Sequence, residues 1–173
     1  MNRKIKSYIL QYTLYSLIFL FLYLLQTAPG ALVVSGYKPL LLLPAAVCVA
    51  MHDRELVGGI FGTVGGMLCD MSAMTYFGFN AILFLILGTA VGLLVEYLMQ
   101  GTLLNALLFT LAALTLVMLC AYFFQYGLWN YEGSQIILWK KMLPTILYST
   151  LWALPFYPLF GRLSRLFAAQ REF

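Results

Sequence analysis

Charge is the scarcest property of this sequence. Asp, Glu, Lys and Arg make up only 9% of the residues, whereas a soluble domain has about 25%. Hydrophobic residues instead account for 63% of the chain, and the mean hydropathy is +0.91. A domain of 173 residues has too little interior to bury this much apolar surface. These values exclude a soluble globular protein and predict an all-α integral membrane protein, with one polytopic domain over residues 1–173.

Residues that carry catalysis or bind metals are also few. His52 is the only histidine, and the three cysteines, Cys48, Cys69 and Cys120, show no CxxC spacing. We expect the cysteines to be small buried apolar residues and expect no metal site. No GxSxG, P-loop, HExxH or dinucleotide-binding motif occurs. The sequence therefore predicts neither an enzyme nor a bound cofactor.

The apolar residues are gathered into six spans. These are Tyr8 to Gln26, Leu40 to Met51, Leu56 to Met71, Phe77 to Val95, Thr102 to Gln125 and Met142 to Phe160. A membrane-spanning helix needs about 20 residues, so the second span is short. It could be a half-helix or lie partly at the membrane interface. We expect a bundle of six transmembrane helices, with five as the alternative count.

Basic residues indicate how the spans are oriented. If both termini are cytoplasmic, seven of the ten lie on the inner side, namely Arg3, Lys4, Lys6, Arg54, Arg162, Arg165 and Arg171. The outer side then has Lys38, Lys140 and Lys141, with Tyr37, Trp129, Tyr131 and Trp139 as interfacial aromatic anchors. The positive-inside rule favours this arrangement, which requires an even number of spans. The net charge of +4 thus indicates topology, and no nucleic-acid partner is expected.

The two ends of the chain allow alternatives. Ala28 and Gly30 are small enough for a signal-peptide cleavage site, but the first apolar run is long and five more spans follow, so we expect it to be retained. The tail from Gly161 to Phe173 is basic and weakly amphipathic. We expect it to be a positive topology anchor, with a helix lying on the inner leaflet as the alternative.

The third span carries glycines at a regular spacing. Gly58, Gly62 and Gly66 are four residues apart, and Asp70 follows after four more. Positions at this spacing stay near one helix face, so another backbone could approach it closely. Asp70 would need a partner at this depth, and we expect it to be buried, with Asn80 as a neighbour that could hydrogen-bond it.

Two other spans show related features. The fourth repeats the spacing with Gly88, Gly92 and then Glu96, which we expect to be a solvated acid at the helix end. The last span is interrupted by Pro144, Pro155 and Pro158. Proline removes a backbone donor and clashes with the preceding turn, so we expect a kinked helix packed in the bundle.

The central motif resembles the rod shape-determining protein MreD family. Its residues are Glu55, Gly58, Gly62, Gly65 or Gly66, Leu68 and Asp70, followed by Gly78, Asn80 and Ala81. A Lys-Pro-Leu-Leu-Leu entry to the second span adds to the resemblance, although Lys38-Pro39-Leu40 departs from a family pattern that often has an acid after the proline.

The resemblance implies a non-enzymatic scaffold of the bacterial cell-elongation complex in the cytoplasmic membrane, which supports lateral peptidoglycan synthesis. It implies MreC as a partner, with MreB, RodA and a class B penicillin-binding protein beside it and membrane lipid around it. It also implies a fold similar to the substrate-binding subunits of energy-coupling-factor transporters. On this interpretation the helix-packing and partner-binding residues are Glu55, Gly58, Gly62, Gly65, Gly66, Asp70, Gly78 and Asn80.

Two other functions stay open. A vitamin-binding subunit of an energy-coupling-factor transporter would have a similar size, and Trp129, Asn130, Tyr131 and Glu132 could line its ligand site. Those subunits typically present alanines on the first span, which here has neither alanine nor glycine. A transporter or channel for small solutes would need more polar groups within the membrane than Asp70, Asn80 and Asn105.

Overall fold

The computed structural model describes residues 3–30, 32–33, 36–73, 77–98, 101–124 and 142–172, and the regular elements within them are helices. These helices are α1 (Arg3–Thr27), α2 (Leu42–His52), α3 (Glu55–Ala73), α4 (Phe79–Tyr97), α5 (Leu103–Tyr122), α7 (Leu143–Leu151) and α8 (Ala153–Glu172). A helix therefore lies at each of the six predicted ranges, and the last range holds two. The prediction of an all-helical chain is confirmed.

Length and composition mark the bundle as a membrane protein. Three helical segments are long and apolar enough to cross a membrane: Ile5–Thr27 of α1, Phe79–Tyr97 and Leu103–Tyr122. Large apolar side chains are exposed on their outer faces, among them Phe21, which is 61% exposed, and Leu104, which is 68% exposed. In a bilayer these side chains would contact lipid instead of water.

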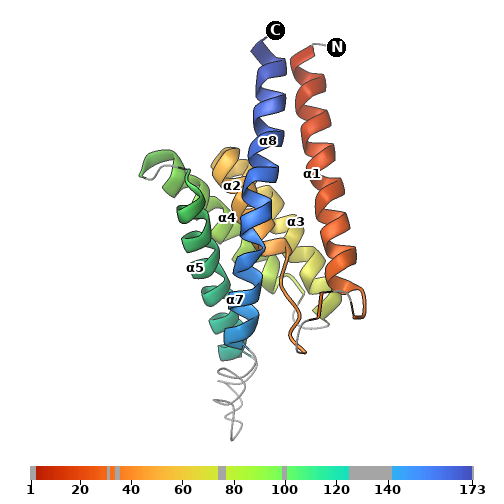
Figure 1. The fold of residues 1–173 in the computed structure, drawn as a ribbon, viewed down its shortest axis with the longest axis vertical. Coiled ribbons are helices and arrows are strands. Elements are labelled where there is room, and N and C mark those ends of the chain that lie inside the picture. Colours follow the sequence, from red (N-terminus) through yellow and green to blue (C-terminus); the bar gives the residue numbers. More distant parts are fainter. Residues whose placement is uncertain are drawn as a thin grey trace, which may run out of the picture.

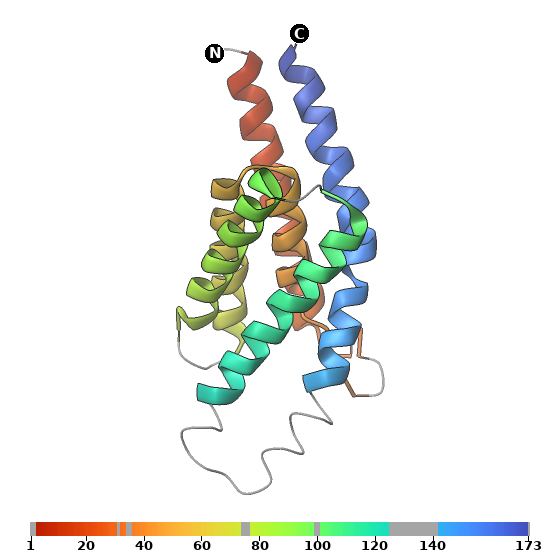
Figure 2. The same ribbon diagram turned by 90° about the vertical axis from the view of Figure 1, so that its left-hand side faces the viewer.

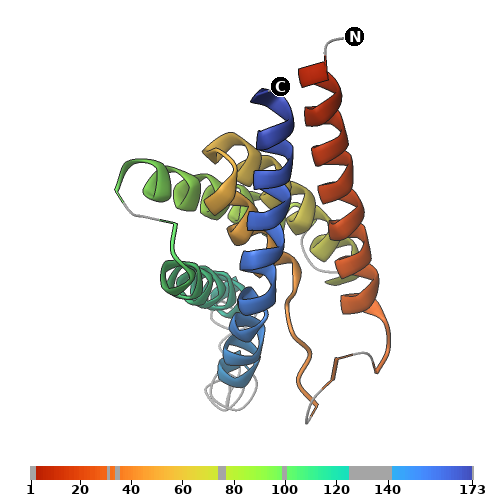
Figure 3. The ribbon, with the colours of Figure 1, turned by 45° about the horizontal axis from the view of Figure 1, so that its top comes forward.

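Both chain termini lie at one end of the bundle, which we call the terminal end (Figure 1). Helices α1 and α8 run side by side there and extend beyond the other helices (Figure 2). The hydroxyl of Ser7 in α1 donates a hydrogen bond to the backbone carbonyl of Phe167 in α8, at 3.3 Å. Helices α3 and α4 form an antiparallel pair, and α5 crosses the bundle obliquely (Figure 2). Helix α1 stands at the edge of the bundle (Figure 3).

The short helix α2 forms the centre of the bundle. Every residue from Leu42 to Met51 is buried, and α2 packs against α3, α4, α5 and α8. Its 11 residues span about 16 Å, roughly half of the ~30 Å hydrocarbon layer. The segment that was expected to be a half-helix or to lie partly at the interface is thus a short helix enclosed by the other helices. Its hydrophobic sequence reflects burial among other helices.

Aromatic side chains join α1, α3 and α8 beside this central helix. The Tyr15 ring lies 5.5 Å from that of Phe61 and 5.4 Å from that of Phe160, both edge-on. The Phe19 ring lies 5.3 Å from that of Phe61. Edge-to-face contacts of this kind add to the stabilisation that burial provides.

The last span is broken, as its prolines predict. Helix α7 ends at Leu151 and α8 begins at Ala153. Pro155 lacks the backbone N–H that would bond the carbonyl of Leu151, and its ring clashes with that carbonyl. Helix α8 then continues without interruption to Glu172. The tail is thus an extension of the last span beside α1, and it does not form a separate helix on the membrane surface.

Candidate functional site

The glycine face of α3 packs directly against the backbone of α4. A Cβ atom added to Gly66 would lie 2.5 Å from the Ala81 Cα and from the Asn80 carbonyl oxygen, and one added to Gly62 would collide with the Phe84 carbonyl. One on Gly92 of α4 would lie 2.5 Å from the Glu55 Cα. We call this contact the glycine seam; its members are Gly58, Gly62 and Gly66 of α3 and Gly88 and Gly92 of α4.

The other members complete the seam, and two further glycines lie beside it. Gly58 and Gly88 pack against each other's backbone, so neither could carry a side chain without moving a helix. Gly65 lies on another face, where an added Cβ would be 3.2 Å from the Phe19 ring. Gly59 contacts Thr89. The glycine face is therefore an internal helix contact, and it is closed to an external partner.

Asp70 caps the start of α4 from the neighbouring helix. Its side chain is 3% exposed. Its carboxylate accepts hydrogen bonds from the backbone N–H groups of Gly78 at 2.9 Å, Asn80 at 3.2 Å and Ala81 at 3.2 Å. The Asn80 side-chain amide donates a fourth, at 2.8 Å, which confirms the predicted contact. The negative charge also lies at the positive end of the α4 dipole.

Gly78 explains why Asp70 has this role. Gly78 is the N-cap residue of α4, its φ is +93°, and it has no side chain with which to cap the helix. A left-handed φ of this kind favours glycine, so the turn into α4 leaves its first N–H groups without a local acceptor. Asp70 supplies that acceptor. The acid at the end of the glycine face therefore fixes the α3–α4 connection.

The start of α2 is capped in the same way by α1 and α7. The side-chain oxygen of Gln26 accepts hydrogen bonds from the backbone N–H groups of Leu41 at 2.8 Å and Leu42 at 3.4 Å. The Ser149 hydroxyl accepts one from the Leu40 N–H at 2.8 Å. A short buried helix leaves several N–H groups unpaired at its start, and these contacts satisfy them.

At the other end of α2, Asp53 joins α1 and α8. Its carboxylate accepts hydrogen bonds from the Gln11 amide at 3.0 and 3.2 Å, from the Tyr15 hydroxyl at 2.7 Å and from the Ser164 hydroxyl at 3.2 Å. The two α1 residues also bind each other, since the Gln11 amide donates a hydrogen bond to the Tyr15 hydroxyl at 3.0 Å. Gln11 and Tyr15 are fully buried. This polar cluster fixes the positions of α1 and α8 relative to the central helix.

This role of the first span was not among the predictions made from the sequence. Gln11 and Gln26 are uncharged, but glutamine is uncommon in an apolar span and needs a hydrogen-bond partner there. The two residues are 15 positions apart, which corresponds to about 22 Å of helix. That distance matches α2 with its two capping turns. A pair of glutamines in the first span was therefore an available signal for a short helix packed against it.

Two further acids, Glu55 and Glu96, lie at the terminal end of the glycine seam, and they are more exposed than Asp70. Glu55 is half-buried at the start of α3, where Gly92 packs against its backbone. Glu96 is exposed near the end of α4, in agreement with the predicted acid at a helix end. Within the described ranges, no group of three or more His, Cys, Asp or Glu side chains is arranged to hold a metal ion.

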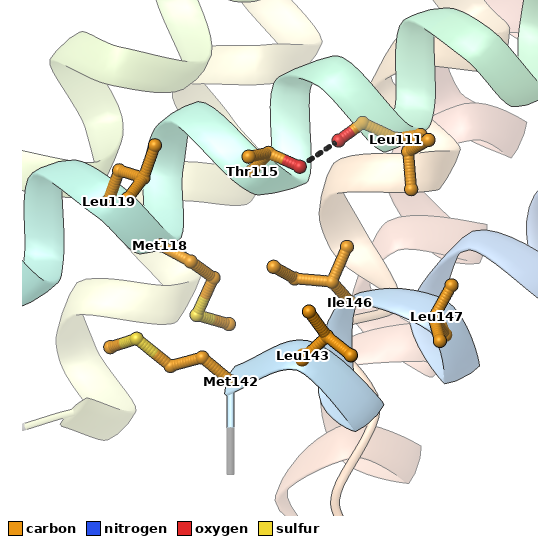
Figure 4. Close-up of a pocket in the computed structure, with 8 residues that line it drawn as sticks. All are labelled: Leu111, Thr115, Met118, Leu119, Met142, Leu143, Ile146 and Leu147. Atoms are coloured by element: carbon orange, nitrogen blue, oxygen red, sulfur yellow. Dashed lines mark hydrogen bonds between the residues drawn. The ribbon is translucent and has the colours of Figure 1, made fainter. Parts of the chain in front are cut away.

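Open apolar grooves remain on the outside of the bundle. The α1/α3 groove, of about 290 Å³, is lined by Tyr12, Ser16, Val57, Ile60, Phe61 and Val64. The α5/α7 groove, of about 220 Å³, is lined by Leu111, Thr115, Met118, Leu119, Met142, Leu143, Ile146 and Leu147 (Figure 4). A third cavity, the Lys38 pocket, is polar and lies at the end opposite the termini; its lining is Gln26, Thr27, Lys38, Pro39, Leu40 and Ser72.

A buried capping acid, a glycine seam and apolar helices long enough to cross a bilayer define a polytopic helical membrane protein. The chain matches the family model described as rod shape-determining protein MreD over residues 6–167, and it belongs to the MreD family. Membership gives the protein a role in rod shape determination, and the family is part of the MreBCD shape complex. The resemblance seen in the central motif is thereby confirmed.

Neither of the other comparisons adds a relative. No curated protein and no solved structure matches the chain. The expected similarity to energy-coupling-factor subunits is therefore without support from a structure. The predicted aromatic anchors Trp129, Tyr131 and Trp139, and the residues that could line a vitamin site, lie outside the described residues.

Proposed function

We propose that the protein is a non-enzymatic membrane scaffold of the cell-elongation complex that binds MreC and supports lateral peptidoglycan synthesis. Its family role in shape determination is the starting point. Asp70 caps α4, Gln26 caps the start of α2, and Asp53 binds side chains of α1 and α8 at the other end of α2. These contacts use the three groups structurally and leave apolar grooves as the open surfaces.

We further propose six membrane crossings in the bacterial cytoplasmic membrane with both termini cytoplasmic. Both termini lie at one end of the bundle, as an even number of crossings requires (Figure 1). Lys6, Arg162 and Arg165 are exposed toward that end, whereas Lys38 lies toward the other. The positive-inside rule assigns the more basic end to the cytoplasm.

The proposed partners come from the family's place in the shape complex. MreC would bind within the membrane and on its outer side, and MreB, RodA and a class B penicillin-binding protein would act beside it. The observation that carries the proposal is the closure of the glycine seam, because it holds a rigid bundle whose remaining apolar faces can receive another helix.

Affinity purification of the tagged chain from its native host, with mass spectrometry of the co-purified proteins, tests the proposal. We expect MreC, accompanied by peptidoglycan synthases. The variant Ile82→Leu, at an exposed position of α4 outside the grooves, serves as a control that retains them. Recovery of a pair of ATPases with a coupling membrane protein, and no MreC, would overturn the scaffold function in favour of a transporter subunit.

A further inference from the structure

We propose that the α1/α3 groove receives one transmembrane helix of the partner, and that the Lys38 pocket binds a carboxylate at the outer end of that helix. The inference rests on the proposed function, since it locates the surface that such a partner would use. The occupant is thus defined by its chemistry: an apolar helix of membrane length followed by an acidic residue.

An exposed apolar stripe runs along α3, and two of its members, Ile60 and Val64, line the groove. Leu56, Ile60, Val64, Met67 and Met71 follow the spacing of one helix face and are 68%, 60%, 38%, 45% and 65% exposed. The stripe extends over 15 residue steps, or about 22 Å. Phe61, which is buried, forms its floor against Tyr12, with ring centroids 6.3 Å apart. A helix could therefore contact α3 along most of the membrane.

The α1 side of the groove permits close approach. Ser16 is small and exposed, and its hydroxyl already donates to the Tyr12 carbonyl at 2.9 Å. A small residue lets a second backbone come near, and a hydroxyl that is satisfied within its own helix does not require water. Helix α1 stands at the edge of the bundle, so this side is accessible from the membrane (Figure 3).

The groove and the Lys38 pocket lie between the same two helices. Tyr15 and Phe61 join α1 and α3 beside the groove, and Gln26 and Cys69 join them beside the pocket, with 3.8 Å between Nε2 and Sγ. Ser72 of α3 and Thr27 of α1 line the pocket directly. A helix in the groove would thus bring its outer end to the pocket.

Charge complementarity identifies what that end carries. The Lys38 ammonium donates to the Thr27 carbonyl at 3.2 Å, and the described residues that line the pocket include no acid. The nearby Asp70 does not neutralise it, since its carboxylate is buried and holds the start of α4. The pocket of about 380 Å³ leaves room for a carboxylate from another chain, and a charge-assisted hydrogen bond is the contact that Lys38 would favour.

The α5/α7 groove provides the control. None of the described residues that line it is charged, and its Thr115 hydroxyl donates to the Leu111 carbonyl of its own helix at 2.7 Å (Figure 4). Leu147 lies in this groove and is 56% exposed, close to the 60% of Ile60. The two residues therefore form a matched pair of exposed apolar positions.

Photo-cross-linking in native membranes tests the inference. The full chain carries p-benzoylphenylalanine in place of Ile60 or of Leu147 and is expressed with MreC. We expect a cross-link to MreC from position 60 and none from position 147. In the chain labelled at position 60, Lys38→Glu should reduce the cross-link several-fold, whereas Lys38→Arg should preserve it.

Each of the other outcomes contradicts one part of the proposal. A cross-link to MreC from position 147 alone, or lipid as the sole product at position 60 while MreC still co-purifies, overturns the α1/α3 location and leaves the proposed function intact. An unchanged cross-link in Lys38→Glu overturns the carboxylate contact. Failure of MreC to co-purify with the unsubstituted chain refutes the proposed function itself.

Discussion

Asp70 and Asn80 are joined twice, once through the Asn80 side-chain amide at 2.8 Å and once through its backbone N–H at 3.2 Å. The double contact ties the last turn of α3 to the first turn of α4. It converts an acid that hydrocarbon would not tolerate into a helix cap, because four donors and the α4 dipole surround the carboxylate.

Removal of this acceptor should destabilise the bundle. Asp70→Ala leaves the N–H groups of half-buried Gly78 and buried Ala81 without this acceptor, and we expect a loss of about 1–3 kcal/mol for such unpaired groups. Asn80→Ala removes one of the donors and should cost less. The measurement is thermal unfolding in mild detergent. Met71→Ala, at an exposed position of the same helix turn, is the control. Equal destabilisation by Asp70→Ala and Met71→Ala would refute the capping role.

The glycine seam should not accept even a methyl group. In Gly62→Ala the added carbon meets the Phe84 backbone, which cannot move as a side chain can. We expect destabilisation of about 1–3 kcal/mol from overpacking. Gly62→Leu should abolish rod shape in a complementation assay, because α3 and α4 must separate.

Gly65→Ala provides the comparison for this substitution. Its added carbon would meet the Phe19 ring, whose side chain can shift by a few tenths of an ångström. We expect a smaller loss of stability than in Gly62→Ala. Rods of normal shape in cells with Gly62→Leu would show that the seam does not matter for function.

The Asp53 cluster should behave as one coupled unit. Tyr15→Phe and Ser164→Ala each remove a hydrogen bond to the same carboxylate, and we expect each to cost about 1 kcal/mol. Groups that share a partner are seldom additive, so a double-mutant cycle should give a coupling energy of about 0.5–3 kcal/mol. Unfolding midpoints of the single and double variants measure it, and strictly additive losses would contradict the shared contact.

Gln26 should control the order of the central helix. Gln26→Leu leaves the N–H groups of Leu41 and Leu42 unpaired, whereas Gln26→Glu retains an oxygen that can accept from them. We expect faster amide hydrogen exchange at the start of α2 in Gln26→Leu and near-normal exchange in Gln26→Glu. Mass spectrometry of the peptide that contains residues 40–44 reads this difference. Equal protection in both variants would show that Gln26 does not cap α2.

The sequence by itself determined the class and the helices. A chain with so few polar residues must lie in lipid. A helix suits that environment because each helix pairs its own backbone N–H and C=O groups. The prolines of the last span indicated a kinked helix, because a missing N–H acts on the chain locally, and the structure has a break before Pro155. The spacing of the glycines indicated a closely packed face, and the central motif indicated the family.

Only the tertiary structure decided what those residues contact. Whether the glycine face meets α4 or a foreign helix depends on the path of the chain, and α4 occupies it. Helix α2 is too short to cross the membrane. Side chains of α1 and α7, Gln26 and Ser149, bind its start, and Asp53 at its end binds Tyr15 of α1. Such contacts join residues as many as 111 positions apart, so a glutamine in an apolar span indicates that a partner exists but not which residue it is.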